Sequence, residues 1–151
     1  MPSPPVHHVD IRAFCYATEV PDRVEAALRA IYPPLDGDGE PAIVRTTTEG
    51  HYGHRIDIFE ARLSTADEVR TVFERLRARG DLDQLATELD ERVTDENELY
   101  LRLDKQAAFA DGDLVFGDGI EVSMKLEAYP AKREAAIENI SAYLDELRAE
   151  P

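Results

Sequence analysis

Apolar and polar residues alternate along several short stretches of the chain, which is the period typical of a β-strand with one buried face. In the clearest case, 98–104, three leucines alternate with the outward-facing Tyr100 and Arg102. In another stretch the alternation changes phase after Ile58, which predicts a β-bulge. The predicted strands are 9–17, 42–48, 55–63, 98–104, 114–116 and 120–127.

Apolar residues at three- and four-residue spacing predict four helices. Pro21 suits the first turn of one helix, and a capping box at 65–68 begins the next. The third is predicted over 82–93, and Pro130 begins the last. The element order is then β-α-β-β-α-α-β-β-β-α, with Asp118-Gly119 as a hairpin turn. This order predicts an α+β two-layer sandwich, a mixed or antiparallel sheet with helices on one face.

The chain has 151 residues, which is enough for one domain. We expect residues 8–150 to form this domain and residues 1–7 to be a flexible end. The start lacks the regions of a signal peptide, and no stretch reaches the roughly 18 apolar residues of a membrane span. We therefore expect a cytoplasmic protein without a membrane partner.

The charge balance is strongly acidic, with 17 basic and 32 acidic residues and a net charge of −15. The chain lacks the high pI, above about 9, that is typical of nucleic-acid-binding domains, and we expect no DNA partner. Because the acids are dispersed, we interpret them as a solvated surface that stays soluble in concentrated salt, and we take a halophilic source as a hypothesis. In molar salt the Debye length is about 3 Å, so this charge would scarcely repel an anionic partner.

Motifs for catalysis are absent from the sequence, which has neither a Gly-x-Ser-x-Gly nor a Walker pattern. Cys15 lies on the apolar side of a predicted strand, so we interpret it as a core thiol and not a nucleophile. His51 and His54, beside Asp57, could hold a metal ion, although a glycine-rich turn does not fix both rings on one face. We predict no enzyme, no cofactor and no metal site, and keep a metal-dependent hydrolase as an alternative.

The chain has 14 arginines but only three lysines, and the lysines all lie between residues 105 and 132. Lys105 follows Arg102 at the end of one predicted strand, and Lys125 faces outward from another. Lys132-Arg133 is predicted in the first turn of the last helix, where backbone N–H groups favour an anion. Two interpretations stay open at this point: phosphate contacts, or ordinary surface cations that balance the acids.

Two segments, LRLDKQAA at 101–108 and KLEAYPAKR at 125–133, resemble the two strongest motifs of an archaeal family of small RNA-binding proteins. That family has been proposed to be linked to the exosome. Residues 12–19 resemble the opening strand of the family, and 49–54 resemble its glycine turn. In this turn His54 stands where the family pattern has Asn.

The resemblance spans about residues 8–148. It implies a fold similar to the ribosomal protein that binds 5S rRNA, and RNA binding without catalysis. Tyr52, Tyr100 and Phe109 could stack on unpaired bases, whereas Tyr129, which precedes a proline, is predicted to be a structural anchor. The predicted RNA-binding residues are Arg12, His51, Tyr52, Arg102, Lys105, Gln106, Lys125, Lys132 and Arg133.

The sequence therefore favours a non-catalytic protein that binds structured RNA through a local basic patch, in or near ribosomal or RNA-processing complexes. This hypothesis requires that cations from late in the chain converge in space. The alternative is a protein-interaction subunit without RNA contact, whose acidic faces or exposed sheet edge form the interface, for example in a homodimer.

Overall fold

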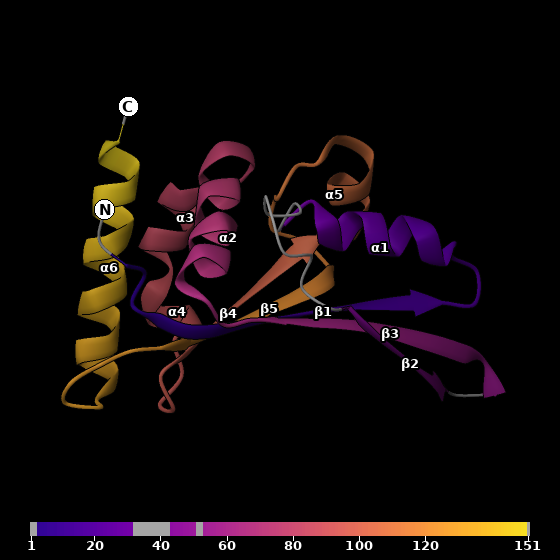
Figure 1. The fold of residues 1–151 in the computed structure, drawn as a ribbon, viewed down its shortest axis with the longest axis horizontal. Coiled ribbons are helices and arrows are strands. Elements are labelled where there is room, and N and C mark those ends of the chain that lie inside the picture. The colour runs from indigo at the N-terminus through magenta and orange to yellow at the C-terminus, as the bar shows by residue number, and fades with distance from the viewer. Residues whose placement is uncertain (1–2, 32–42, 51–52, 151) are drawn as a thin grey trace.

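The computed structural model describes residues 3–31, 43–50 and 53–150. Figure 1 shows a sheet with the helices on one side of it, and the opposite side carries no helix of these described ranges. The elements are β1 (Val6–Tyr16), α1 (Pro21–Arg29), β2 (Val44–Glu49), β3 (Arg55–Leu63), α2 (Ala66–Arg79), α3 (Leu82–Thr87), α4 (Leu89–Arg92), β4 (Glu98–Asp104), α5 (Lys105–Asp111), β5 (Gly119–Leu126) and α6 (Arg133–Ala149).

The five strands form one sheet in the order β2-β3-β1-β5-β4, and every pair of neighbours is antiparallel. The α+β prediction with helices on one face is confirmed, and of the two sheet types it allowed, the antiparallel one is present. None of the helices in the described residues is both long and apolar enough to cross a membrane.

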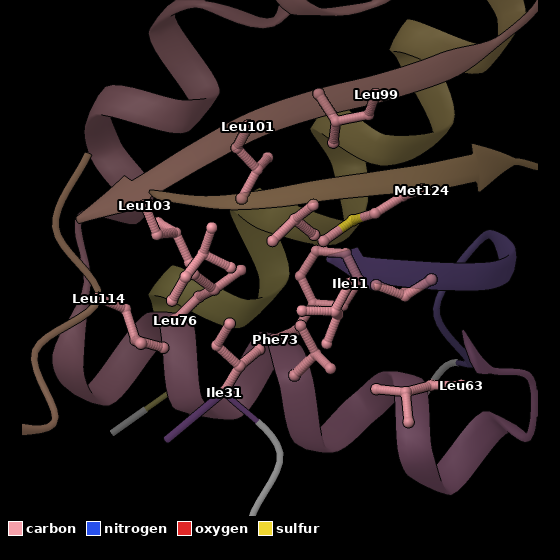
Figure 2. Close-up of a cluster of buried hydrophobic side chains, with 14 of the residues drawn as sticks. Ile11, Ile31, Leu63, Phe73, Leu76, Leu99, Leu101, Leu103, Leu114 and Met124 are labelled. Atoms are coloured by element: carbon pink, nitrogen blue, oxygen red, sulfur yellow. The ribbon is translucent and has the colours of Figure 1, made fainter. Parts of the chain in front are cut away.

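The core lies between the helices and one face of the sheet. Figure 2 shows the leucines of β4 and Met124 of β5 pointing toward Phe73 and Leu76 of α2. The Phe73 ring is fully buried and meets Tyr143 of α6 edge to face, with 5.1 Å between the ring centroids. The leucines at 99, 101 and 103 are buried while Tyr100 is exposed, so the predicted alternation of β4 is confirmed.

The first strand begins earlier than its alternation indicated. Val6 pairs with Leu126 of β5, and both Pro4 and Val6 are buried, so β1 begins within the stretch 1–7, whose flexibility stays a prediction. The register shifts between Val6 and His8, which brings Val6 and Val9 to the same buried face although they are three residues apart. This irregularity hides the start of the strand from a strict two-residue period.

The predicted bulge in 55–63 is wrong, because β3 pairs with β1 residue by residue from Ile56 to Leu63. The phase change has another cause. Ile56 and Ile58 lie on the open face, and Asp57 is the buried residue between them. Asp57 tolerates this position because Thr47, Arg45 and Arg55 all donate hydrogen bonds to its carboxylate.

The segment between β4 and β5 also differs from the prediction. Residues 105–111 form α5, in which Asp104 caps the first turn by accepting a 2.9 Å hydrogen bond from the Ala107 N–H. Residues 114–116 are not a strand, since they make only single bridges, one of which joins Phe116 to Leu103. Leu103 also pairs with β5 on its other side, so Asp118-Gly119 does not connect two hairpin strands.

Two helix predictions need correction. The helix predicted over 82–93 is broken at Glu88 into α3 and α4, although its apolar residues are buried as expected. The last helix begins at Arg133 and not at Pro130, with Lys132 at its N-cap. Tyr129 is 98% exposed, so the prediction that it anchors the chain structurally is wrong. A side chain with no packing partner cannot fix the path between β5 and α6.

Candidate functional site

The helix-free face of the sheet, which we call the open face, is hollowed over β3, β1, β5 and β4 and reaches Val44 at the start of β2. The hollow has a volume of about 690 Å³. Its side chains come from strand positions that alternate with the core residues, which is why one set of strands builds both faces. They are Asp10, Arg12, Val44, Glu60, Arg62, Tyr100, Glu121 and Ser123.

Charges of opposite sign alternate across the strands of the open face. In one cross-strand row, Arg12 lies between Glu60 and Glu121, and Arg102 follows Glu121 on β4. The Arg12 guanidinium donates to Glu121 at 2.9 Å. In the next row Arg62 donates to both oxygens of Asp10, at 2.7 and 2.9 Å, and this carboxylate raises the pKa of Arg62.

The charges of these two rows cancel, because three arginines face three carboxylates. The net charge of −15 is therefore carried by the rest of the molecule. Arg102 is the most weakly paired of the three arginines. Its side chain is 68% exposed, and its ion pair with Asp118 is 3.8 Å long. The open face is thus a locally neutral surface on an acidic protein, and its arginines point into solvent.

Exposed aromatic rings accompany these arginines. Tyr100 is 47% exposed, and its hydroxyl donates to Glu98, which raises the pKa of the phenol. Tyr16 is 51% exposed at the end of β1. Phe14, on the same face, lies under the Arg12 guanidinium at 5.2 Å from the ring centroid. Such rings offer flat surfaces on which a base or another planar group can stack.

Three of the predicted cations lie together at one end of the sheet. Lys125 donates to the carbonyl oxygen of Glu96, and Arg133 donates to the carbonyl oxygens of Asp90 and Val93. Both side chains therefore hold the segment that joins α4 to β4. The Lys132 side chain is exposed and makes no hydrogen bond or ion pair within the described ranges, so its ammonium is the cation here that is available to a ligand.

Lys105 and Gln106 lie elsewhere, at the start of α5. Lys105 is only 8% exposed, and its ammonium donates to the carbonyl oxygen of Phe14 at 2.6 Å and to Glu19 at 2.8 Å. A side chain on Gly119 would be 2.6 Å from the Cβ of Lys105, so glycine is needed there for the close approach. Lys105 is thus an internal cation in this structure.

The predicted cations do not converge into one patch. Lys125 pairs with Glu98 at the start of β4, whereas Lys105 directly follows the end of β4. Seven strand residues separate the two positions by about 20 Å. Arg12 and Arg102 lie between them on the open face, which gives three separate places.

Some predicted residues lie outside the described ranges. His51 and Tyr52 belong to this group, so their roles remain predictions. Within the described residues there is no cluster of three or more potential metal ligands, and Asp57 is already bound by Arg45 and Arg55. The Cys15 thiol is buried, and burial raises its pKa, in agreement with an unreactive core thiol.

Sequence reasoning missed two arginines that the structure places near solvent. The outward position of Arg62 follows from the alternation in β3, once the phase change at Asp57 is understood as a buried carboxylate. The guanidinium of Arg23 lies over the Phe109 ring. No signal in the sequence connects Arg23 with Phe109, because α5 was not predicted and its contact with α1 is a tertiary one.

A family model described as RNA binding matches residues 8–126. An RNA-binding protein of Pyrococcus abyssi, PAB1135, is 30% identical over 145 residues, covering 92% of this chain and 94% of that protein. Two solved structures of DUF54 proteins cover 92% of this chain. One, from Archaeoglobus fulgidus, is 28% identical over 99% of its own length with a TM-score of 0.77; the other, from Methanothermobacter thermautotrophicus, is 35% identical over 98% with a TM-score of 0.73. The chain therefore belongs to the RNA-binding family that this model describes.

Proposed function

We propose that this protein binds structured RNA without catalysing its cleavage, with the open face as the main contact surface. Family membership and the name of the Pyrococcus relative support RNA as the ligand. The observation that carries the proposal is the neutral, hollowed face on which Arg12, Arg102 and Tyr100 are all exposed to solvent. Arginines contact phosphates, and tyrosines stack on unpaired bases.

The electrostatics decide what kind of binding this is. Arg12 and Arg62 must exchange a carboxylate partner for a phosphate, so neither contributes the free energy of a fully free cation. Few counterions are then released on binding, and stacking and hydrogen bonds have to supply most of the affinity. A salt concentration that screens the net charge of −15 favours this type of contact, in keeping with the proposed halophilic source.

The loop between β5 and α6, residues 127–132, supplies a second contact in this proposal. Lys132 is a free cation within the described residues, and the exposed ring of Tyr129 lies three residues before it. Lys125 and Arg133 hold the neighbouring segment in place, so they position this loop. Of the predicted residues we assign phosphate contacts to Arg12, Arg102 and Lys132, and a positioning role to Lys105, Lys125 and Arg133.

The test compares two double variants of equal charge change. Arg12→Ala/Arg102→Ala removes two open-face cations, whereas Arg70→Ala/Arg148→Ala removes two from helices. In molar KCl we expect the first variant to bind copurified RNA at least tenfold more weakly than the second. Because phosphate contacts do not depend on the bases, this loss of affinity should be about the same for RNAs of different sequence. Equal affinities would remove the open face from the proposal. Sequencing the RNA that copurifies at native salt tests the ribosomal or processing association.

One observation favours the protein-interaction alternative. Every residue of β2 is exposed, and its outer edge pairs with no strand of the described chain. Such an edge can pair with a strand of another molecule, including a second copy. Crosslinking in cells decides between the two functions, since recovery of RNA supports the first, and recovery of protein alone supports the second.

A further inference from the structure

A second hollow, of about 170 Å³, lies between α1 and α5 on the helix-covered side of the fold. Figure 1 shows these two helices next to each other at one end of the molecule. We call this hollow the α1–α5 pocket. Its polar and aromatic walls are Thr18, Glu19, Arg23, Lys105, Gln106 and Phe109.

The floor of the α1–α5 pocket is fixed by internal bonds. The Lys105 ammonium donates to Glu19 and to the carbonyl oxygen of Phe14. The same oxygen of Glu19 also accepts a 3.1 Å hydrogen bond from the N–H of Tyr16. Because the charges of Lys105 and Glu19 compensate each other, the ammonium and the carboxylate at the floor of the pocket need no ligand to balance them.

The groups at the rim have unused binding capacity. The Arg23 guanidinium lies 5.4 Å from the centroid of the Phe109 ring and has no carboxylate partner among the described residues. Gln106 is exposed and its side-chain amide makes no hydrogen bond within those residues, while Phe109 is 40% exposed. With the floor neutral, Arg23 leaves the pocket with a single positive charge on a protein of net charge −15.

We propose that the α1–α5 pocket binds one unpaired nucleobase, with adenine preferred, and that in the cell this base belongs to the RNA of the proposed function. Its volume is below the roughly 300–1,000 Å³ of pockets for larger ligands, so it suits a single small ring system. The amide of Gln106 presents a donor and an acceptor side by side, which matches the edge of adenine. Arg23 and Phe109 offer stacking surfaces and a contact for the attached phosphate.

Strand β1 leads from the open face toward the pocket, because its last residue, Tyr16, lies near the pocket residue Lys105. Arg12, Phe14 and Tyr16 follow one another along the open side of this strand, over about 13 Å. The ring of Tyr16 is half exposed and lies 5.3 Å from the Lys105 ammonium at the pocket floor. A nucleotide strand that contacts Arg12 can therefore place its next unpaired base in the pocket.

The first experiment titrates the isotope-labelled full chain with adenosine monophosphate, and separately with uridine monophosphate, in molar KCl. We expect NMR shifts confined to residues 18–23 and 105–109, with the adenine nucleotide binding more tightly. Gln106→Ala and Phe109→Leu should each weaken this binding by roughly tenfold. The matched control is Gln84→Ala, a glutamine on α3 away from the pocket, which should bind as the wild type does.

The second experiment compares an RNA hairpin carrying one bulged adenine with the same hairpin fully paired. The wild type should prefer the bulged hairpin, and Gln106→Ala and Phe109→Leu should lose that preference. If both hairpins bind equally and the nucleotides leave the pocket unshifted, the pocket proposal is overturned while RNA binding stands. If neither hairpin binds but adenosine monophosphate shifts the pocket residues, the pocket is a nucleotide site and the RNA proposal fails.

Discussion

The two faces of the sheet are built from the same strands but are stabilised in opposite ways. On the helix-covered face, apolar side chains such as Phe73 and Leu101 pack without solvent. On the open face, arginines and carboxylates balance one another while exposed to water. Burial of apolar area contributes about 25 cal/mol per Å², whereas an exposed ion pair contributes about 0–1 kcal/mol. The covered face therefore determines folding, and the open face is free to change its partners.

The largest expected effect contrasts an aromatic residue of the core, Phe73 of α2, with one on the open face, Tyr100 of β4. Phe73→Ala leaves a cavity beside Tyr143 and should lower the free energy of unfolding by about 3–5 kcal/mol. Tyr100→Ala removes an exposed ring and should change it by less than about 0.5 kcal/mol. Urea unfolding at a fixed KCl concentration measures both. A large loss for Tyr100→Ala would show that the open face also supports the fold.

A smaller effect separates internal from surface cations. Lys105→Ala leaves the Phe14 carbonyl oxygen without this donor and Glu19 without its cation, and should cost roughly 1–3 kcal/mol of stability. Lys132→Ala should leave stability unchanged and weaken RNA binding a few-fold, as expected for loss of one phosphate contact. Thermal unfolding and RNA titration on both variants check this. The reverse pattern would make Lys105 the ligand contact.

The buried carboxylate on the covered face gives a pH-dependent effect. Hydrogen bonds from Thr47 and Arg45 lower the pKa of Asp57 to about 2. Because the folded-state pKa is below that of the unfolded chain, Asp57 stabilises the protein above pH 4, and this stabilisation is lost as the pH falls from about 4 toward 2. Asp57→Asn should therefore be less stable than the wild type at pH 7, with a difference that shrinks at pH 2. Urea midpoints at the two pH values measure the difference, and a constant difference would contradict the prediction.

The smallest expected effect is the salt dependence of RNA binding. Once the salt concentration screens the net charge of −15, contacts to about two or three phosphates should make the logarithm of the affinity fall with the logarithm of the salt concentration with a slope of only about −2. Titrations from low to molar KCl measure this slope. A slope several times steeper would mean a basic surface that the paired arginines of the open face do not provide.

The sequence by itself determined the faces of the strands. The alternation in 98–104 and the capping box at Thr65 depend on neighbours within a few residues, and both are present in the structure. Local patterns failed where one residue departed from the period, as at the irregularity after Val6 and at Asp57. The short helix α5 was missed because its four apolar residues, 107–110, directly follow one another, and seven residues are too few to show a helical period.

Only the tertiary structure decided which cations are available to a ligand. The carboxylate that binds Arg12 lies 109 residues away in the sequence, and the one that binds Lys105 lies 86 residues away. The antiparallel register of β4 with β5 pairs Lys125 with the start of β4, whereas Lys105 directly follows the end of β4, so the two lysines lie at opposite ends of this strand. Ion pairs and strand order depend on contacts between distant segments, and no local period encodes them. The side of a strand that a residue faces is a local property of the sequence. The partner that its side chain binds on that side depends on the tertiary structure.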